Sequence, residues 1–159
     1  MALQTAREGI VLLRNQNNLL PLSAIAKKKV LVIGKFAKTV AEGLGSAKVE
    51  GYNKIKMIDA LQKELGKGVT FIETPTDEQL KNASTLIVSV GTSDSESWDR
   101  PFALPENDEI LAQRAATLNK NVVVVINAGG GVKMTNWNNK VSAILYVWYG
   151  GQTGNTALA

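Results

Sequence analysis

Four short apolar runs, each rich in valine, isoleucine or leucine, recur along this chain of 159 residues. They span Val30–Gly34, Leu86–Val90, Asn121–Ile126 and Ala143–Val147. A strand with one face in water alternates apolar and polar side chains, whereas nearly continuous apolar runs of this length are typical of strands covered on both faces. Such strands occur in parallel sheets with helices on either side, so these runs restrict the chain to an α/β fold.

Helical patterns and one weaker strand pattern fill the intervals between the runs. Leu3–Arg14 carries apolar residues at helical spacing, and the proline-containing Leu19–Leu22 predicts an extended segment that covers the sheet. Further elements are expected as helices at Asn53–Gly66, at Thr76–Leu80, from Pro105 and from Thr153, and as a strand at Val69–Ile72. The alternation predicts a single domain over residues 1–159, a three-layer sandwich with a mainly parallel five- or six-stranded sheet, a helix between consecutive strands and helices on both faces.

Residues at the ends of two expected helices support their placement. Asn53 can cap one helix, and Gly66 suits the left-handed position that follows its last turn. Pro105 is expected at a first helical position, where its missing N–H costs nothing, and three acidic residues follow it in the first turn.

The composition excludes several kinds of chemistry. The chain has neither cysteine nor histidine, which excludes thiol nucleophiles, Ser-His-Asp triads and most zinc sites, and we expect no cofactor and no metal. The net charge of +4 comes mostly from scattered lysines, and the run Lys27–Lys29 lacks interleaved aromatic residues, so we expect no nucleic-acid partner. No segment reaches the roughly 20 apolar residues of a membrane span, so we expect no membrane partner either; the compartment stays open.

Two glycine-containing loops follow predicted strands, Gly43–Ser46 and Asn127–Gly131. Their glycines let the backbone approach a ligand closely, but the spacing matches neither a Gly-x-Gly-x-x-Gly fingerprint nor a phosphate loop, so we do not expect a nucleotide site. A flexible turn without function is the alternative for Gly43–Ser46.

The polar stretch Gly91–Arg100 follows the strand Leu86–Val90, at the end where open α/β sheets bind ligands. Within it, Glu96 is our candidate proton donor. Trp98 is expected either to stack on a sugar ring or to anchor the loop. Asp99 is expected to form a structural ion pair with Arg100. A solvated polar loop is the alternative for the whole stretch.

Several pieces of the chain, in order, resemble the carboxy-terminal α/β sandwich domain of glycoside hydrolase family 3, the β-glucosidase type. The matching pieces are Ala6–Asn15 with Leu19–Leu22, Val30–Gly34, Gly43–Ser46, Ser95–Arg100 with Leu104-Pro105, Val122–Val132 and Trp148–Gln152. The resemblance covers nearly the whole chain.

The resemblance implies a retaining hydrolase of β-linked glucosides or related sugars, with its active site between this domain and a (β/α)8 barrel. The family's nucleophile is a barrel aspartate, and its acid/base is a glutamate in a motif similar to Ser-Glu-Gly-Tyr-Asp-Arg, which corresponds to Glu96. The same resemblance implies that Gly45, Ser46, Trp98 and Arg100 bind substrate. A general acid of this kind needs a carboxyl group whose pKa is raised by burial or by a neighbouring carboxylate, and here the burial would have to come from the partner.

The chain departs from the family pattern in several respects, among them Lys35, where proline is common. The chain lacks the roughly 250 residues of the barrel, and with them the nucleophile. Ser97 stands where the family usually has glycine, and Ala159 precedes the family's last helix. We therefore expect a domain fragment that is inactive alone. The alternative is an engineered or free-standing α/β sandwich that acts as a binding or assembly scaffold, with an exposed apolar patch where the barrel would dock and the capacity to form a homo-oligomer through it.

Overall fold

A six-stranded sheet forms the middle layer of the computed structural model, which describes all of residues 1–159. Its strand order is β1-β6-β5-β4-β2-β3, and every neighbouring pair is parallel except β1 with β6. The strands are β1 (Val11–Asn15), β2 (Val30–Ile33), β3 (Val69–Phe71), β4 (Thr85–Gly91), β5 (Val122–Asn127) and β6 (Ala143–Tyr146). The helices are α1 (Ala2–Gly9), α2 (Met57–Leu65), α3 (Asp77–Lys81), α4 (Glu106–Leu118) and α5 (Gly154–Leu158). The predicted α/β class and mainly parallel sheet are confirmed.

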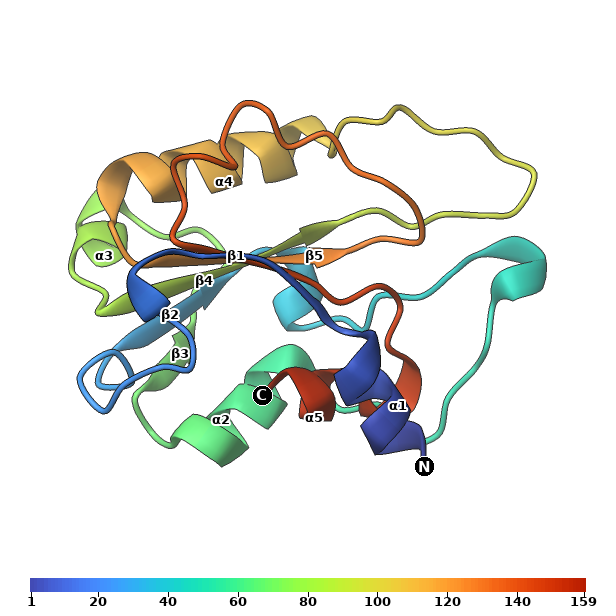
Figure 1. Ribbon diagram of the computed structural model, residues 1–159, viewed down its shortest axis with the longest axis horizontal. Coiled ribbons are helices and arrows are strands. Elements are labelled where there is room, and N and C mark those ends of the chain that lie inside the picture. Colours follow the sequence, from blue (N-terminus) through green and yellow to red (C-terminus); the bar gives the residue numbers. More distant parts are fainter.

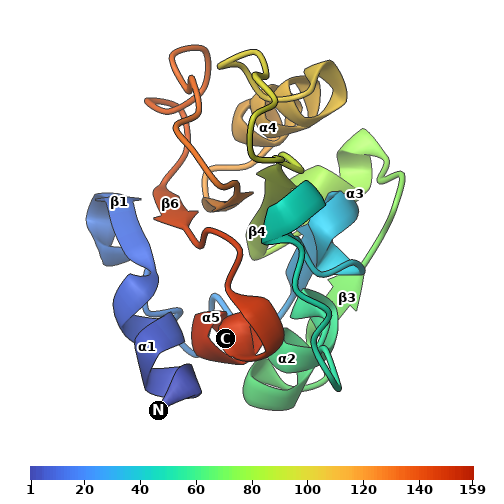
Figure 2. The same cartoon turned by 90° about the vertical axis from the view of Figure 1, so that its right-hand side faces the viewer.

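Helices cover both faces of the sheet. Figures 1 and 2 show α3 and α4 on one face and α1, α2 and α5 on the other. Single-turn 3-10 segments interrupt the connections at Gln16–Asn18, Lys35–Ala37, Gly45–Ala47 and Gly151–Thr153. No helix is long and apolar enough to cross a membrane.

The buried strands divide their side chains between two hydrophobic clusters. On the α3/α4 face, Val88 of β4 and Val124 of β5 pack into one cluster, whereas Ile87 and Val125 point to the opposite cluster with Met57 of α2. This two-residue alternation follows from strand geometry, because successive side chains lie on opposite faces. Both faces are apolar, which is why the strands read as continuous apolar runs.

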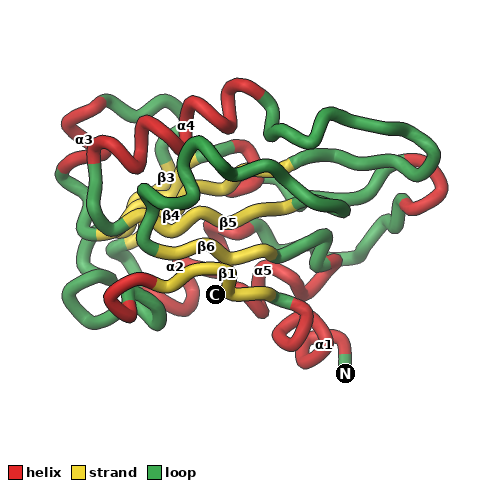
Figure 3. The backbone as a smooth tube through the Cα atoms, turned by 45° about the horizontal axis from the view of Figure 1, so that its top comes forward, coloured by secondary structure: helices red, strands yellow, loops and turns green.

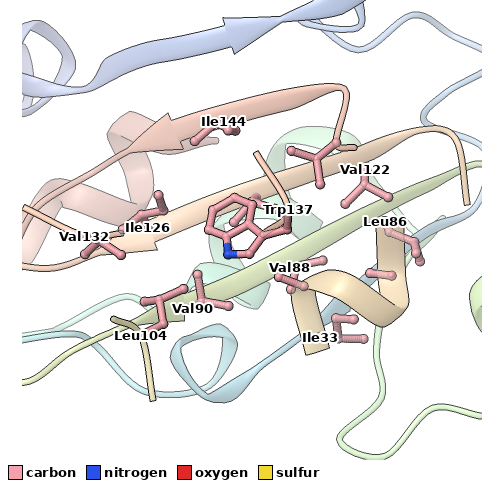
Figure 4. Packing of buried hydrophobic residues seen from close by; sticks show 14 of the residues in the cluster. Ile33, Leu86, Val88, Val90, Leu104, Val122, Ile126, Val132, Trp137 and Ile144 are labelled. Carbon is pink, nitrogen blue, oxygen red and sulfur yellow. The ribbon is translucent and has the colours of Figure 1, made fainter. Parts of the chain in front are cut away.

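Trp137 fills the α3/α4 face between β5 and β6, in a connection that contains no helix. The predicted helix between these strands is therefore wrong. The indole is fully buried, lies over the strand valines in Figure 4, and donates from Nε1 to Glu109 Oε2 of α4 at 3.3 Å. One large aromatic side chain thus covers the area that a crossover helix would otherwise cover.

The predicted first helix, Leu3–Arg14, is also wrong in its second half. Helix α1 ends at Gly9, and β1 pairs antiparallel with β6, with Val11 opposite Tyr146 and Asn15 opposite Ala143. This pairing satisfies backbone groups that would be exposed if β6 were the edge of the sheet. Tertiary pairing outweighs the helical spacing of the apolar residues.

Helix α2 begins later than predicted, at Met57 rather than after Asn53. Asn53 has a left-handed φ of 49° and does not cap the helix. The carbonyl of Ile55 accepts from Asn155 Nδ2 at 2.9 Å, so it is bound to α5 instead of a helical N–H. The prediction for the end of this helix is confirmed, because Gly66 follows its last turn with a positive φ of 86°.

Helices α3 and α4 begin close to their predicted positions. Thr76 forms a capping box with Gln79 at the start of α3. Pro105 occupies the N-cap of α4, one position before the predicted one, and Glu106, Asp108 and Glu109 lie in the first turn.

The connections after β2 and β4 leave the sheet in opposite directions. From β2 the chain passes through α2 to β3 at one edge, and from β4 it passes through α4 to β5 on the other side. Ligands of open α/β sheets bind beside such a switch in strand order, at the carboxyl ends of the strands. Figure 3 shows the long loops that extend from this end of the sheet.

Candidate functional site

Two long loops meet beyond the carboxyl ends of β2 and β4. The backbone N–H of Leu44, in the loop after β2, donates to the carbonyl oxygen of Asp94, in the loop after β4, at 2.8 Å. Leu44 also forms an isolated parallel bridge with Ser95. These contacts place residues 43–46 beside residues 94–98, as the shared position at the strand ends predicts.

A cavity of about 920 Å³ opens between these loops. Both acidic and aromatic side chains line it, together with glycines from the loop after β5. The lining includes Glu42, Lys54, Asp94, Glu96, Trp98, Asp99, Arg100, Phe102 and Tyr149. Its volume is in the range of small-molecule sites.

Glu96 lies on the wall of this cavity and is exposed. Ser46 Oγ donates to Glu96 Oε2 at 2.6 Å, so one oxygen of the carboxylate is fixed by a hydroxyl from the other loop. Gly45 and Ser46 do not line the cavity themselves. Gly45 is required for the close approach, because it has φ 62° and an added Cβ would lie 2.5 Å from Ser95 Oγ.

Arg100 pairs with Asp94 and not with Asp99, so the predicted ion pair is wrong. Arg100 Nε lies 2.5 Å from Asp94 Oδ1. The same guanidinium donates from Nη1 to the carbonyl oxygen of Pro101 at 3.0 Å, and from Nη2 to the carbonyl oxygens of Gly130 and Gly131 at 3.2 and 3.1 Å. Asp99 remains exposed on the cavity wall.

Asp94 is held more firmly than its position in a polar loop suggests. Its Oδ2 accepts from the backbone N–H of Gly129 at 2.7 Å, and its side chain is 20% exposed. Burial alone would raise the pKa of Asp94, but hydrogen bonds from Arg100 and from the Gly129 N–H outweigh it and lower the pKa. Asp94 is therefore ionised at neutral pH.

Tyr149 connects the end of β6 to the loop after β4. Its hydroxyl donates to the carbonyl oxygen of Thr92 at 3.1 Å and accepts from the backbone N–H of Asp94 at 2.8 Å. Burial raises the pKa of Tyr149, which keeps the phenol protonated. The adjacent Trp148 donates from Nε1 to the carbonyl oxygen of Gly9 at 3.0 Å and so attaches this segment to α1.

Large apolar side chains stand exposed around the cavity. Trp98 is 79% exposed, Phe102 64%, Tyr52 83% and Val49 76%, and all four line it. Trp98 is therefore not a buried anchor of its loop. An exposed cluster of aromatic side chains at the mouth of a cavity is typical of a surface that meets a ligand or another protein domain.

Two residues of this site were not anticipated from the sequence: Glu42 and Lys54 form an ion pair on the cavity wall. Asp94 was expected as a solvated neighbour of Glu96, but it links segments that are distant in the chain. No local pattern marks these contacts, because their partners lie far away in the sequence. No group of three acidic side chains is placed so that it could hold a metal ion.

Comparisons with known proteins identify the family of this domain. The family model for the glycosyl hydrolase family 3 C-terminal domain matches residues 10–159. An exo-α-(1→6)-L-arabinopyranosidase from Bifidobacterium breve is 31% identical over all of this chain and 24% of its own length. A β-glucosidase from Bacteroides ovatus is 30% identical over 99% of this chain and 26% of its own length. The chain thus spans about a quarter of the curated relatives it matches.

Solved structures of the same family share the fold of this chain. The crystal structure of a family 3 β-glucosidase from Bifidobacterium adolescentis superposes with a TM-score of 0.85 and 31% identity, over 99% of this chain and 26% of that one. The order of motifs, the sheet and the family model agree over nearly the same residues. The chain belongs to glycoside hydrolase family 3 and corresponds to the C-terminal domain of its members.

Proposed function

We propose that this chain supplies the acid/base residue, Glu96, of a retaining glycosidase that acts on β-linked glucosides or related sugars. The observation that carries the proposal is the position of Glu96 on the cavity wall, in the Ser95–Arg100 motif, with one carboxylate oxygen held by Ser46. In such an enzyme the acid protonates the leaving glycosidic oxygen and later activates the water that releases the sugar.

The hydrogen bond from Ser46 supports this role. It occupies Oε2 and fixes the carboxyl group from a separate loop. Oε1 is left free to carry the proton, and a general acid must present that proton to the leaving oxygen in a fixed geometry.

The second carboxylate of the reaction has to come from a partner. A retaining mechanism needs a nucleophile about 5–5.5 Å from the acid/base, and we propose that a (β/α)8 barrel domain provides it. The relatives are about four times as long as the matched region, which leaves room for such a domain. The exposed Trp98, Phe102 and Tyr52 form the surface on which it would dock.

The proposed substrate class is broad because the names of the relatives cover several glycosides. Their names include an α-linked L-arabinopyranosidase, β-glucosidases and a β-D-xylosidase. These pyranosidases act on closely similar rings, so we propose a β-glucoside or a related pyranoside as the substrate, in a cavity that Trp98 can close by stacking on a sugar ring.

The test joins this chain to the barrel of a relative, such as the Bacteroides ovatus β-glucosidase. We expect Glu96→Gln to slow hydrolysis of a disaccharide by about 10²–10⁴-fold. An aryl glucoside with an acidic leaving group should lose far less, because its departure does not require protonation. Glu64→Gln, an exposed carboxylate of α2 that does not line the cavity, is the control and should change neither rate.

The isolated chain gives a second measurement. Without a nucleophile it should not hydrolyse an aryl β-glucoside. Equal rates of disaccharide hydrolysis by the joined protein and by its Glu96→Gln variant would refute the assignment. Hydrolysis by the isolated chain that survives Glu96→Gln would refute it as well.

The scaffold alternative predicts that the same exposed surface joins copies of this chain. Sedimentation or size-exclusion measurement of mass separates the two proposals. A dimer that Trp98→Ser and Phe102→Ser disrupt would favour the scaffold, whereas a monomer that binds a barrel domain would favour the enzyme.

A further inference from the structure

Asp94 contacts every loop that forms the cavity. Its carboxylate accepts from Arg100 in its own loop and from the Gly129 N–H in the loop after β5. Its backbone N–H donates to Tyr149, and its carbonyl oxygen accepts from Leu44. Four segments, which are far apart in sequence, meet at this one residue.

The glycine at position 129 is part of the same arrangement. A Cβ there would lie 3.1 Å from Asp94 Oδ2 and 2.9 Å from Tyr149 Cε2. Any side chain at this position would force Tyr149 or the carboxylate to move away from the backbone N–H that Asp94 Oδ2 now reaches at 2.7 Å. The loop after β5 is thus shaped to receive Asp94.

Arg100 is almost fully occupied by the same network. A guanidinium has five N–H donors, and four of the five donate to Asp94, Pro101, Gly130 and Gly131. A single N–H remains for a substrate. A residue whose donors are used in this way acts by holding the neighbouring segments in place.

We propose that Asp94 is the positioning residue of the site, and that Arg100 acts through it. Together they hold the loop that carries Glu96, the loop that carries Ser46 and the Gly129–Gly131 loop in a single arrangement. The catalytic meaning of this arrangement rests on the proposed function, but the arrangement itself can be tested without substrate.

The test is amide hydrogen exchange followed by NMR on this 159-residue chain. In Asp94→Asn a neutral amide replaces the carboxylate. The amide has a single acceptor oxygen, so it cannot replace the two carboxylate oxygens that accept from Arg100 and from Gly129. We expect the amides of Gly129 and Leu44 to exchange at least about tenfold faster. Amides of the central strands, such as Val124, should keep their rates.

The signal of the Glu96 side-chain carboxyl carbon gives the readout for positioning. We expect it to shift in Asp94→Asn, because the Ser46 hydroxyl moves with the loop that Leu44 anchors. Asp99→Asn is the matched control, since it removes an exposed charge from the same loop, and it should change neither the exchange rates nor the Glu96 signal.

Arg100→Lys tests the coupling with a milder change that keeps the charge. We expect it to accelerate the same two amides, and the double variant with Asp94→Asn to be no faster than Asp94→Asn alone. If Asp94→Asn does not fold, acceleration at Leu44 and Gly129 in Arg100→Lys decides the matter.

Three results would overturn the proposal. They are a Leu44 rate within about twofold of the original, equal acceleration of all amides, and an equal effect of Asp99→Asn. A failure of Glu96→Gln to slow hydrolysis would refute the proposed function and leave these exchange results unaffected.

Discussion

Replacement of Ser97 by glycine should stabilise the loop that carries Glu96. Ser97 is exposed and has φ 62°, in the left-handed region that side chains other than glycine disfavour. The family motif that this loop resembles has glycine at this position, and the φ value gives a physical reason for that glycine. Ser93 lies in the same loop, is also exposed and does not have a positive φ, so Ser93→Gly is a matched control.

The expected size of the effect comes from the difference between the two variants. Left-handed backbone costs a residue with a Cβ about 1–2 kcal/mol, and Ser97→Gly removes that cost. Glycine also makes the unfolded chain more flexible, which lowers stability by about 0.4–1 kcal/mol in both variants alike. The difference between them therefore isolates the folded backbone, and it should be about 1–2 kcal/mol in favour of Ser97→Gly.

Urea and thermal unfolding measure this difference directly. For a domain of this size about 1 kcal/mol corresponds to about 2–4 °C, so Ser97→Gly should melt at least about 2 °C above Ser93→Gly. The slope of the urea transition should be the same in both, because neither substitution changes the surface exposed on unfolding. Equal midpoints, or a higher midpoint for Ser93→Gly, would refute the reasoning from φ.

Three further perturbations address the core, a buried acid and the loop after β5. Trp137→Ala should destabilise the chain by about 3–5 kcal/mol in urea unfolding, since it empties a fully buried site. Burial raises the pKa of Asp108 above its ordinary value, although the Gly91 N–H and Lys35 oppose this. The folded state therefore holds a proton on Asp108 more tightly than the unfolded state does. The stability that this proton contributes is lost as the pH rises through the folded-state pKa. Asp108→Asn should thus gain stability relative to the original chain as the pH rises above the ordinary pKa of an aspartate, whereas Glu106→Gln, an exposed acid of the same helical turn, should show no such gain. Gly129→Ala should cost about 1–3 kcal/mol, and Gly130→Ala, whose added Cβ would meet nothing closer than 3.8 Å, should cost less than half of that.

Much of the fold could be predicted because its strongest signals are local. The valines of β5 and the apolar residues of β4 identify buried parallel strands. Thr76 and Gly66 mark helix ends, Thr76 through its capping side chain and Gly66 through its positive φ. Strand β1 could not be predicted in this way. Its residues have a helical spacing, and only the unpaired edge of β6, about 130 residues away in the sequence, gives them a strand conformation.

The same distinction applies to the site. Glu96 stands out in a motif that can be read in the sequence, and Ser46 lies in a glycine loop that the resemblance includes. The contacts of Asp94 cannot be read in this way, because Gly129 and Tyr149 are 35 and 55 positions away. The predicted pairing of Arg100 was wrong for another reason: adjacency in sequence favoured Asp99, whereas the fold of the loop places Asp94, six positions away, against the guanidinium.

The two acids of this loop that are fixed by hydrogen bonds differ in what they can do. Both oxygens of Asp94 accept from donors, one from a guanidinium and one from a backbone N–H, and its lowered pKa keeps it ionised. Such a carboxylate cannot donate a proton. Glu96 has one oxygen bonded to the hydroxyl of Ser46 and one oxygen free at the cavity. Their surroundings thus make Asp94 a fixed anion and leave Glu96 with one free oxygen at the cavity, and this difference favours Glu96 over Asp94 in the proposed role of proton donor.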